Sequence, residues 1–260
     1  MQPVGGVMNA STVTTLAVPG AWMGSWIWEP TVARLRERGF AARTMTLPGL
    51  AAGLPDAEIA EVRLADHVDA LVAIVTASEK PVVLVGHSYS SMVTAQAADR
   101  LGDAVAGLVH IGGCLPADGL SLLDGWGDSR ATREQERADI QRDGNLWAAP
   151  PRAMLDEEPD LTPDARDHLA ASFTAHPGST VTDAAVLSRP VTDQRSTYVA
   201  LPAAGAEDAW QELPAAAHGA VNWRTRSIVG GHWPMLAQPE PTTDLLAEEI
   251  AHYAGRIDAE

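Results

Sequence analysis

The sequence predicts an α/β protein with a mostly parallel sheet, helices on both faces of the sheet and an inserted helical cap. Short apolar blocks that end in Gly or Pro alternate with stretches that carry apolar residues at helical spacing. Strands and helices that alternate in this way are joined by right-handed crossovers and form a parallel sheet. Between residues 115 and 194, prolines, acidic residues and broken helical pieces replace the regular pattern. We therefore assign residues 1–114 and 195–260 to one core domain and residues 115–194 to a cap inserted into it.

Each core element follows from an apolar block or a helical period together with the residue that ends it. Pro19 and Gly20 close the apolar block at residues 14–18, and Gly39 ends the helical pattern that follows. The continuous apolar character of the blocks indicates strands that are buried on both faces. The predicted strands are residues 14–18, 42–47, 81–87, 106–111, 196–201 and 224–229. The predicted helices are residues 28–38, 66–78, 90–101, 207–217 and 242–253.

The composition argues against several kinds of partner. The chain has 260 residues, 46% of them hydrophobic, which is enough to bury a core without disulfides or metals. A formal net charge of −16 disfavours nucleic acid and anionic membranes. The single cysteine, Cys114, can form neither an internal disulfide nor a cysteine-type metal site, and we expect a small buried hydrophobe there. Because there is no basic leader and no apolar run of about 20 residues, we expect a soluble, cytoplasmic monomer or homodimer.

The stretch "PVVLVGHSYSSM" carries the strongest indication of function. Its apolar block predicts a buried strand, Ser88 follows at once within a Gly-x-Ser sequence, and a helix of small residues begins just after it. A strand, a tight turn and a helix in this order lift a serine Oγ above the sheet as a nucleophile. Gly86 relieves crowding at the turn, and Ser90 stands where the motif has its second glycine. We predict that Ser88 is a catalytic nucleophile; the alternative is a serine that only caps the helix.

The histidine expected to serve Ser88 is His232. It directly follows the last predicted strand, and Gly230 and Gly231 allow the chain to turn there. A loop in this position places its imidazole beside the serine, so we predict that His232 is the general base. The other seven histidines lie in strands, helices, loops, the cap or the turn itself, and we expect no catalytic role for them.

Two backbone N–H groups are predicted to stabilise the oxyanion that forms when a serine attacks a carbonyl. Ala21, in the loop after the first strand, supplies one, and Tyr89, the residue after the nucleophile, supplies the other. The helix that begins after Ser88 adds the positive end of its dipole. The two donors are main-chain groups, so they place no demand on side-chain identity.

Three segments together resemble the α/β-hydrolase superfamily, in particular plant methylesterases, hydroxynitrile lyases and their bacterial esterase relatives. The segments are "TLAVPGAWMGSWIWEPTVARLRERGFAARTMTLPGL", "VVLVGHSYSSM" and "GGHWPM". The resemblance covers most of the chain except the cap. It implies an eight-stranded, mostly parallel sheet, a serine-histidine-acid triad, no cofactor or metal, and a lid that shapes an apolar pocket.

The sequence departs from this family in two places. Pro19 replaces the histidine that usually begins the oxyanion loop. The family's aspartate after the strand that ends near residue 201 is also missing, because Pro202, Ala203 and Ala204 stand there. Loss of this acid typically costs a serine hydrolase about four orders of magnitude in turnover. The remaining options are Asp208 as the acid, Glu207 or Asp118 in its place, or a Ser88–His232 dyad without an acid.

Three functions remain open at this point. The first is hydrolysis of an ester, thioester or lactone of a bulky apolar small molecule. The second is a non-hydrolytic elimination, cyclisation or lyase step in natural-product metabolism, which an incomplete triad fits better, with His232 and Ser88 as acid and base. The third is a binding protein that has lost turnover.

Aromatic and acidic residues bear on the substrate in all three cases. Trp22 adjoins the oxyanion loop, Trp233 adjoins His232, and Trp126 and Trp147 lie in the cap, so we predict that these four side chains wall the pocket. The acidic cap segments "LDEEPD" and "REQERADIQRD" are predicted to be solvated helix faces that disfavour anionic substrates.

Overall fold

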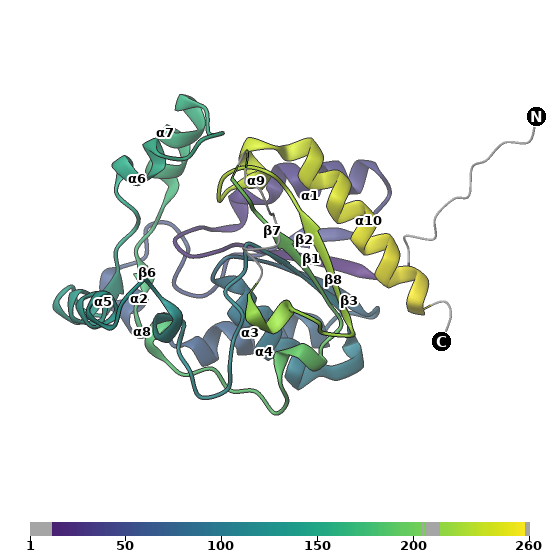
Figure 1. The fold of residues 1–260 in the computed structure, drawn as a ribbon, viewed down its shortest axis with the longest axis horizontal. Helices are drawn as coiled ribbons and strands as arrows, with labels where there is room; N and C mark the ends of the chain where they lie inside the picture. The colour runs from purple at the N-terminus through teal and green to yellow at the C-terminus, as the bar shows by residue number, and fades with distance from the viewer. Residues whose placement is uncertain (1–11, 204, 206–213, 258–260) are drawn as a thin grey trace, which may run out of the picture.

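The computed structural model describes residues 12–203, 205 and 214–257, which form a three-layer α/β core and a cap (Figure 1). Six parallel strands make the central sheet in the order β2-β1-β3-β4-β7-β8. β3 and β4 are buried along their whole length, as expected for a parallel sheet that is covered on both faces. The strands are β1 (Thr14–Val18), β2 (Ala42–Thr44), β3 (Val82–His87), β4 (Val105–Ile111), β7 (Ser196–Ala200) and β8 (Trp223–Ser227).

The strand order creates a switch point between β1 and β3. From β1 the chain first adds β2 on one side and then crosses to add β3 on the other side. Loops that follow the two strands at a switch point diverge and leave a crevice at the carboxyl edge of the sheet. The loop after β1 contains Ala21 and the turn after β3 contains Ser88, so the order of the strands brings both to the same crevice.

Helices cover both faces of the sheet (Figure 1). α1 (Glu29–Glu37) and α10 (Pro239–Ile257) pack together on one face, and α3 (Leu64–Thr76) and α4 (Ser90–Leu101) pack together on the other. Successive side chains of β1 point to opposite faces of the sheet. Leu16 and Val18 pack in the core beneath α3 and α4, whereas Ala17 packs in the core beneath α1 and α10. None of the described helices has the length and apolar character needed to cross a lipid bilayer.

The sheet differs from the sequence expectation in its extent. All six predicted strands are present, but the described residues contribute six strands to the sheet rather than the eight that the family resemblance implied. The apolar blocks of this chain account for six strands only, and residues 1–11 lie outside the described part. β2 is also shorter than predicted, because the chain turns away after Thr44 and the hydroxyl of Thr46 accepts a hydrogen bond from Ser25 N–H at 2.9 Å. Most of the helix predicted at residues 207–217 lies outside the described residues, and Ala215–Ala217 forms a 3₁₀ turn.

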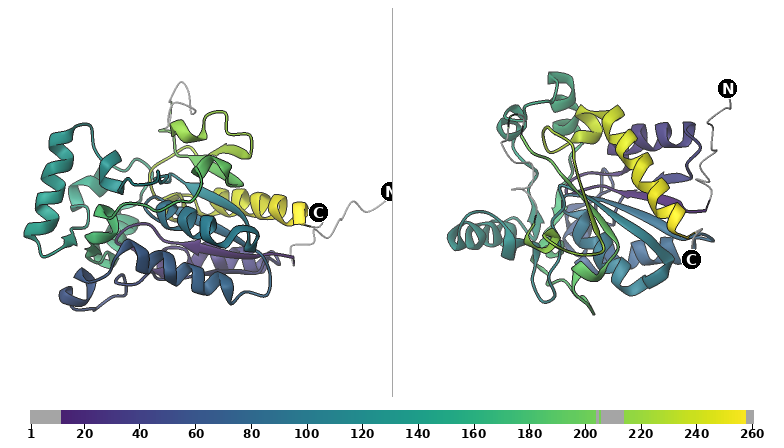
Figure 2. Two further views of the ribbon diagram at one scale, coloured as in Figure 1. Left: turned by 90° about the horizontal axis from the view of Figure 1, so that it is seen from below. Right: turned by 45° about the vertical axis from the view of Figure 1, so that its right-hand side comes forward.

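The cap lies beyond the carboxyl edge of the sheet, where α5 (Arg130–Arg142), α6 (Arg152–Asp156) and α7 (Pro163–Ser172) project from the core layers (Figures 1 and 2). Its helix α8 (Ser179–Thr182) packs against α3. Its one pair of strands in the described residues is antiparallel and short, formed by β5 (Leu146–Trp147) and β6 (His176–Pro177). Ser129 and Thr162 begin its two longest helices by accepting N-cap hydrogen bonds with their side chains. The remaining described α-helices, outside the cap and the four core helices, are α2 (Asp56–Ala60) and α9 (Pro234–Ala237).

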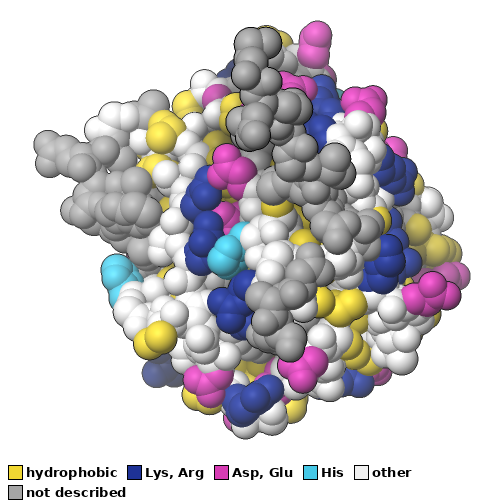
Figure 3. Space-filling view, turned by 90° about the vertical axis from the view of Figure 1, so that its right-hand side faces the viewer, with side chains coloured by type: hydrophobic (Ala, Val, Ile, Leu, Met, Phe, Trp, Pro, Cys, Tyr) yellow, Lys and Arg dark blue, Asp and Glu magenta, His cyan; other side chains and the backbone are white. Residues whose placement is uncertain are grey.

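A buried ion-pair cluster joins β7 and β8 to α10. The carboxylate of Glu249 is fully buried and accepts hydrogen bonds from Arg224 Nε at 2.8 Å, Arg226 Nη1 at 3.0 Å and Thr197 Oγ1 at 2.7 Å. The exposed neighbour Glu248 also pairs with Arg226. On the face of the molecule shown in Figure 3, basic and acidic side chains are interspersed rather than gathered by sign.

Replacement of Glu249 by Ala should destabilise the fold far more than replacement of Glu248. Removal of the buried carboxylate leaves Arg224 without its ion-pair partner and Arg226 with Glu248 alone. Breaking a fully buried pair typically costs about 3–5 kcal/mol, which is the upper value here because both arginine side chains are partly exposed. The exposed Glu248 pair contributes about 1 kcal/mol or less. Urea unfolding of both variants measures the difference, and equal losses would show that the buried cluster does not anchor α10 to the sheet.

Candidate active site

Ser88 occupies a strained turn between β3 and α4. Its φ of +52° lies in the left-handed region, which a residue with a Cβ adopts at a cost of about 1–3 kcal/mol. Two hydrogen bonds hold the turn: Ser88 N–H donates to the carbonyl of Ile111 at 3.0 Å, and Cys114 N–H donates to the carbonyl of Ser88 at 3.1 Å. The backbone of Ser88 is thus tied to the end of β4, at the tight turn between strand and helix that the sequence predicted.

Small residues on both sides of Ser88 make this turn possible. A Cβ on Gly86 would lie 2.8 Å from Thr94 Oγ1 and 3.1 Å from Ser91 N, so only glycine lets α4 approach the strand so closely. Ser90 does more than replace the second glycine of the motif. Its buried hydroxyl accepts from His87 N–H at 2.8 Å and lies 2.8 Å from the carbonyl of Val18, to which it donates. Ser90 therefore links the turn to the end of β1, next to the oxyanion loop.

Both predicted oxyanion residues line the same cavity as Ser88. Ala21 follows β1, and Tyr89 opens the turn into α4. Gly20 brings the oxyanion loop close to the turn, because a Cβ there would lie 2.9 Å from the ring Nδ1 of His87 and 3.0 Å from its carbonyl oxygen. The roles of the two N–H groups remain predictions, and the fold places both residues at the crevice where those roles require them.

The cap holds the oxyanion loop where the family's histidine is missing. Trp22 has a φ of +63°, and its N–H donates to Nδ1 of the buried His176 at 3.2 Å. Its carbonyl accepts from Thr174 N–H at 3.0 Å, and its indole N–H donates to the carbonyl of Trp147 at 3.1 Å. Burial lowers the pKa of His176 well below 6.5, so the ring is neutral, and Nδ1 accepts in the tautomer whose proton is on Nε2, 2.8 Å from Thr180 Oγ1. Cap residues thus hold both main-chain groups of Trp22.

His232 lies on the loop after β8 and lines the cavity that contains Ser88. Its ring centroid is 4.8 Å from that of His87, and its carbonyl accepts a hydrogen bond from His87 Nε2–H at 2.7 Å. Burial lowers the pKa of His232 to about 4, which keeps the imidazole neutral at pH 7. Among the residues that the structure describes, no carboxylate hydrogen-bonds to this imidazole.

The three candidates for the triad acid fare differently. Glu207 and Asp208 lie outside the described residues, so their roles stay predictions. Asp118 is exposed, and its Oδ1 accepts from Leu187 N–H at 2.9 Å. It is not among the described residues that line the cavity of Ser88 and His232, so its position gives no support to a catalytic role.

The cavity has a volume of about 610 Å³, and its wall combines aromatic and acidic side chains. Trp22 and Trp147 contact each other with ring centroids 4.2 Å apart, and Trp126 lies 5.3 Å from Trp147. All four tryptophans predicted to wall a pocket line this one: Trp22, Trp126, Trp147 and Trp233. The prediction that the acidic cap segments are only solvated faces is wrong in part, because four cap carboxylates and one guanidinium also line the cavity. They belong to Glu136, Asp139, Asp143, Glu158 and Arg142.

Residues 16–245 match the alpha/beta hydrolase family. The chain belongs to this family. Among curated proteins, it is 35% identical to the carbendazim hydrolyzing esterase of Nocardioides sp. over 109 residues, 41% of this chain and 44% of that protein. It is 27% identical to the probable hydrolase R7 of Phoma sp. over 243 residues, 90% of this chain and 96% of that protein.

Solved structures of the alpha/beta hydrolase family share the same fold. An extracellular alpha/beta-hydrolase from a Paenibacillus species has a TM-score of 0.75 and 17% identity, over 90% of this chain and 98% of that one. A pyrethroid hydrolase from Sphingobium faniae has a TM-score of 0.66 and 17% identity, over 92% of this chain and 98% of that one. The matched stretch spans less than half of the Nocardioides esterase. The chain is thus a member of the alpha/beta hydrolase family that is similar to proteins named as an esterase and a hydrolase.

Several residues of this alpha/beta hydrolase site were not foreseen from the sequence. His67 is buried beneath Tyr89: its Nδ1 accepts from the phenol at 2.8 Å while its Nε2–H donates to the carbonyl of Pro48 at 2.7 Å. His87 and His176, described above, also hold main-chain groups of the site. None of the three stands in a sequence pattern that distinguishes it from an ordinary core histidine. In the described residues, no group of three His, Cys, Asp or Glu side chains is arranged to hold a metal ion.

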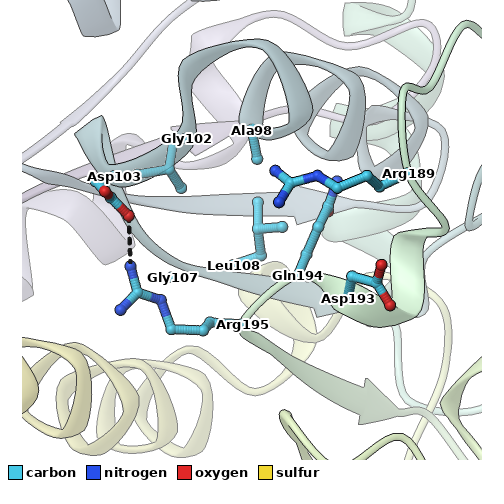
Figure 4. Close-up of a pocket in the computed structure, with 10 residues that line it drawn as sticks. Ala98, Gly102, Asp103, Gly107, Leu108, Arg189, Asp193, Gln194 and Arg195 are labelled. Atoms are coloured by element: carbon cyan, nitrogen blue, oxygen red, sulfur yellow. Dashed lines mark ion pairs between the residues drawn. The ribbon is translucent and has the colours of Figure 1, made fainter.

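A smaller hollow of about 170 Å³ lies at the opposite edge of the sheet, at the amino end of β4 (Figure 4). Arg189, Asp193 and Arg195 stand around it, and Arg195 pairs with Asp103 at 3.6 Å. Its described lining includes neither Ser88 nor His232. In this family the chemistry occurs at the carboxyl edge, so the larger cavity is the candidate active site.

The buried histidines should make the fold sensitive to mild acid. Burial lowers the pKa of His67 and His232 to about 4 and that of His87 and His110 to about 3. Above pH 6.5 each ring is neutral in both the folded and the unfolded state. Between pH 6.5 and 4 only the unfolded chain binds the proton, so stability should fall by up to about 1.4 kcal/mol per pH unit for each ring. Urea unfolding at pH 7 to 4.5 measures this slope.

The variant His110→Phe isolates one of these contributions. Both ring nitrogens of His110 are buried without a hydrogen-bond partner, and the ring stacks on Trp223. Whatever its effect at pH 7, this variant should show a shallower loss of stability below pH 6.5. The variant His168→Gln, at an exposed position, is the control and should lose stability with falling pH as steeply as the wild type. An equally steep loss in His110→Phe would contradict the contribution assigned to His110.

Proposed function

We propose that this protein is a serine hydrolase that cleaves an ester, thioester or lactone of a bulky apolar small molecule. The observation that carries the proposal is the turn at Ser88: a non-glycine residue at positive φ, opening onto a cavity that it shares with His232, Ala21 and Tyr89. Strain of this kind persists only where the surrounding structure enforces it, and it is concentrated at functional sites. A serine that only capped a helix would not need it.

In the proposed reaction, Ser88 Oγ attacks the substrate carbonyl while His232 accepts the hydroxyl proton. The carbonyl oxygen becomes an oxyanion and accepts hydrogen bonds from the N–H groups of Ala21 and Tyr89, which are fixed before the substrate arrives. The tetrahedral intermediate collapses, and His232 returns the proton to the leaving alcohol, thiol or ring oxygen. Water, deprotonated by the same imidazole, then releases the acid product and restores Ser88.

The wall of the cavity supports a bulky, apolar substrate. Four tryptophans and the cap side chains Leu122, Ile140 and Met154 line a volume of about 610 Å³, which lies within the usual range for drug-sized ligands. The name of the carbendazim hydrolyzing esterase from Nocardioides, to which this chain is similar over 109 residues, supports the ester hydrolysis part of the proposal.

A second function, non-hydrolytic acid-base chemistry, is favoured by the isolation of His232. A general base with a pKa near 4 is weak, and no carboxylate of the described residues hydrogen-bonds to its ring to raise its basicity. An elimination or lyase step that removes an already acidic proton would tolerate such a base better than the ionisation of a serine hydroxyl.

Labelling of Ser88 separates the two functions. We expect the wild-type protein to release the alcohol from a chromogenic apolar ester and to bind a fluorophosphonate covalently at Ser88. Ser88→Ala should lose the label and at least about 10³-fold in turnover. Peptide mapping should place the label on Ser88, and Cys114→Ala should still be labelled. An unlabelled wild-type protein that releases no alcohol would exclude the hydrolase and favour the second function.

The acidic cavity should discriminate among substrates by charge. Four carboxylates and one guanidinium line the cavity, so an anionic group on the acyl or alcohol part is repelled. At low ionic strength we expect kcat/KM for an ester with a sulfonate group to be about 10-fold or more below that for its trimethylammonium analogue. High salt should narrow this ratio. Equal values for the two esters at low salt would contradict an electrostatic role for the cavity wall.

A further inference from the structure

Two carboxylates from the cap bind the backbone of the loop that carries His232. Glu158 Oε2 accepts from the N–H of His232 itself at 2.8 Å. Asp160 Oδ2 accepts from Gly231 N–H at 3.1 Å and from the side chain of Gln238 at 2.9 Å. Glu158 also lines the cavity of Ser88. The cap therefore holds the residue predicted to be the general base through its main chain.

The two glycines before His232 are required for this contact. A Cβ on Gly231 would lie 2.1 Å from Glu158 Oε2 and 2.6 Å from Asp160 Oδ1, and a Cβ on Gly230 would lie 2.3 Å from Asp160 Oδ2. Real Cβ atoms do not approach oxygen so closely. The sequence "GGH" thus does more than form a turn, because the absence of two side chains leaves room for two carboxylates.

Placing Glu158 and Asp160 against the His232 loop costs free energy, because both carboxylates lose solvent and repel each other. Burial and the nearby charge of Asp160 raise the pKa of Glu158, and Oδ1 of Asp160 is buried without a hydrogen-bond partner. Arg166 offsets part of the repulsion, and its guanidinium donates to the carbonyl of Glu158 at 2.9 Å.

The segment that carries the two carboxylates is itself anchored in the core. It connects α6 to α7, and Leu155 and Leu161 on either side of it are buried in the same cluster as Trp233 and Met235. Apolar packing before and after the two carboxylates fixes their position against the loop. The cap and the loop after β8 are thus joined by both hydrophobic contact and hydrogen bonds.

We propose that Glu158, supported by Asp160, is the positioning residue for His232, so that the catalytic base is assembled only when the cap is seated on the loop. This inference rests on the proposed function. In the family that this chain resembles, an acid after the strand corresponding to β7 orients the histidine through its ring. Here a carboxylate from the cap orients it through its backbone N–H, and the substrate cavity and the base are completed by the same cap segment.

Four variants test this proposal by amide hydrogen exchange and by steady-state kinetics with the chromogenic ester. Glu158→Ala removes the acceptor, Glu158→Gln keeps an oxygen at the same position, and Asp160→Asn tests the supporting contact. Glu157→Gln is the matched control, because Glu157 is the exposed neighbour of Glu158 and carries the same charge.

In Glu158→Ala, exchange at the amide of His232 should rise by about 10-fold or more. Its kcat should fall about 10- to 100-fold while KM changes little, because a misplaced base slows the chemical step rather than binding. Glu158→Gln should retain both the protection of the His232 amide and most of kcat. Asp160→Asn should give an exchange rate and a kcat between those of Glu158→Ala and Glu158→Gln. Glu157→Gln should match the wild type.

Three results would overturn the inference in distinguishable ways. Unchanged protection of His232 in Glu158→Ala would show that the carboxylate does not hold the loop. Lost protection with unchanged kcat would show that the contact is only structural, while the hydrolase function stands. A wild-type protein with no esterase activity and no fluorophosphonate label would remove the proposed function, and the positioning role would fall with it.

Discussion

The left-handed backbone of Ser88 is the constraint on which the rest of the site depends. A serine at φ +52° is unfavourable in isolation, so the surrounding structure must supply the contacts that hold it there. β3 is buried throughout, Gly86 lets α4 approach it, and the hydroxyl of Ser90 joins the turn to β1. These contacts also fix the distance between the turn and the oxyanion loop. The interactions that hold Ser88 at positive φ therefore also position the groups that are proposed to act with it.

The cap completes this arrangement from outside the core by binding main-chain groups of two loops. His176 accepts the N–H of Trp22 in the oxyanion loop, and Glu158 accepts the N–H of His232. Buried N–H groups need acceptors, and a loop whose own backbone cannot pair in a sheet must find them elsewhere. An imidazole can accept only while it is neutral, and burial keeps His176 in that form. The cap and the two loops at the carboxyl edge of the sheet are therefore linked by hydrogen bonds, although they lie in separate regions of the sequence.

Local sequence patterns predicted the parts of the structure that local interactions determine. The six core strands, the turn at Ser88 and the loop position of His232 follow from apolar blocks, small residues and chain order. The four tryptophans predicted to wall a pocket line one cavity, and each of them adjoins a recognisable motif or lies in the cap. The eight-stranded sheet was an inference from the family rather than from this chain, and the described part does not reproduce it.

The contacts between the cap and the loops after β1 and β8 could not be predicted, because they join residues far apart in sequence. Trp22 and His176 are separated by 154 positions, and Glu158 and His232 by 74. No spacing rule connects such pairs, and an acidic segment such as "LDEEPD" has the composition of an ordinary solvated turn. The low pKa of His232 is equally nonlocal, since it results from the desolvation that the whole fold imposes.

In the proposed reaction, the low pKa of His232 determines how much the general base and the oxyanion donors each contribute to the rate. Burial leaves the imidazole fully neutral at pH 7 but lowers its affinity for a proton, so the ionisation of Ser88 receives less driving force than in a complete triad. Stabilisation of the oxyanion, where negative charge develops, must compensate for this reduced driving force. Tyr89, one of the two proposed donors, is held through its phenol by His67, and Trp22, which follows the other donor Ala21, is held by His176. Electrostatic preorganisation of this kind is usually the largest single contribution to such reactions, and it does not depend on a triad acid. If the proposed reaction takes place, a weak base combined with a rigid oxyanion hole would suit substrates whose carbonyl is already electrophilic, such as activated esters and strained lactones.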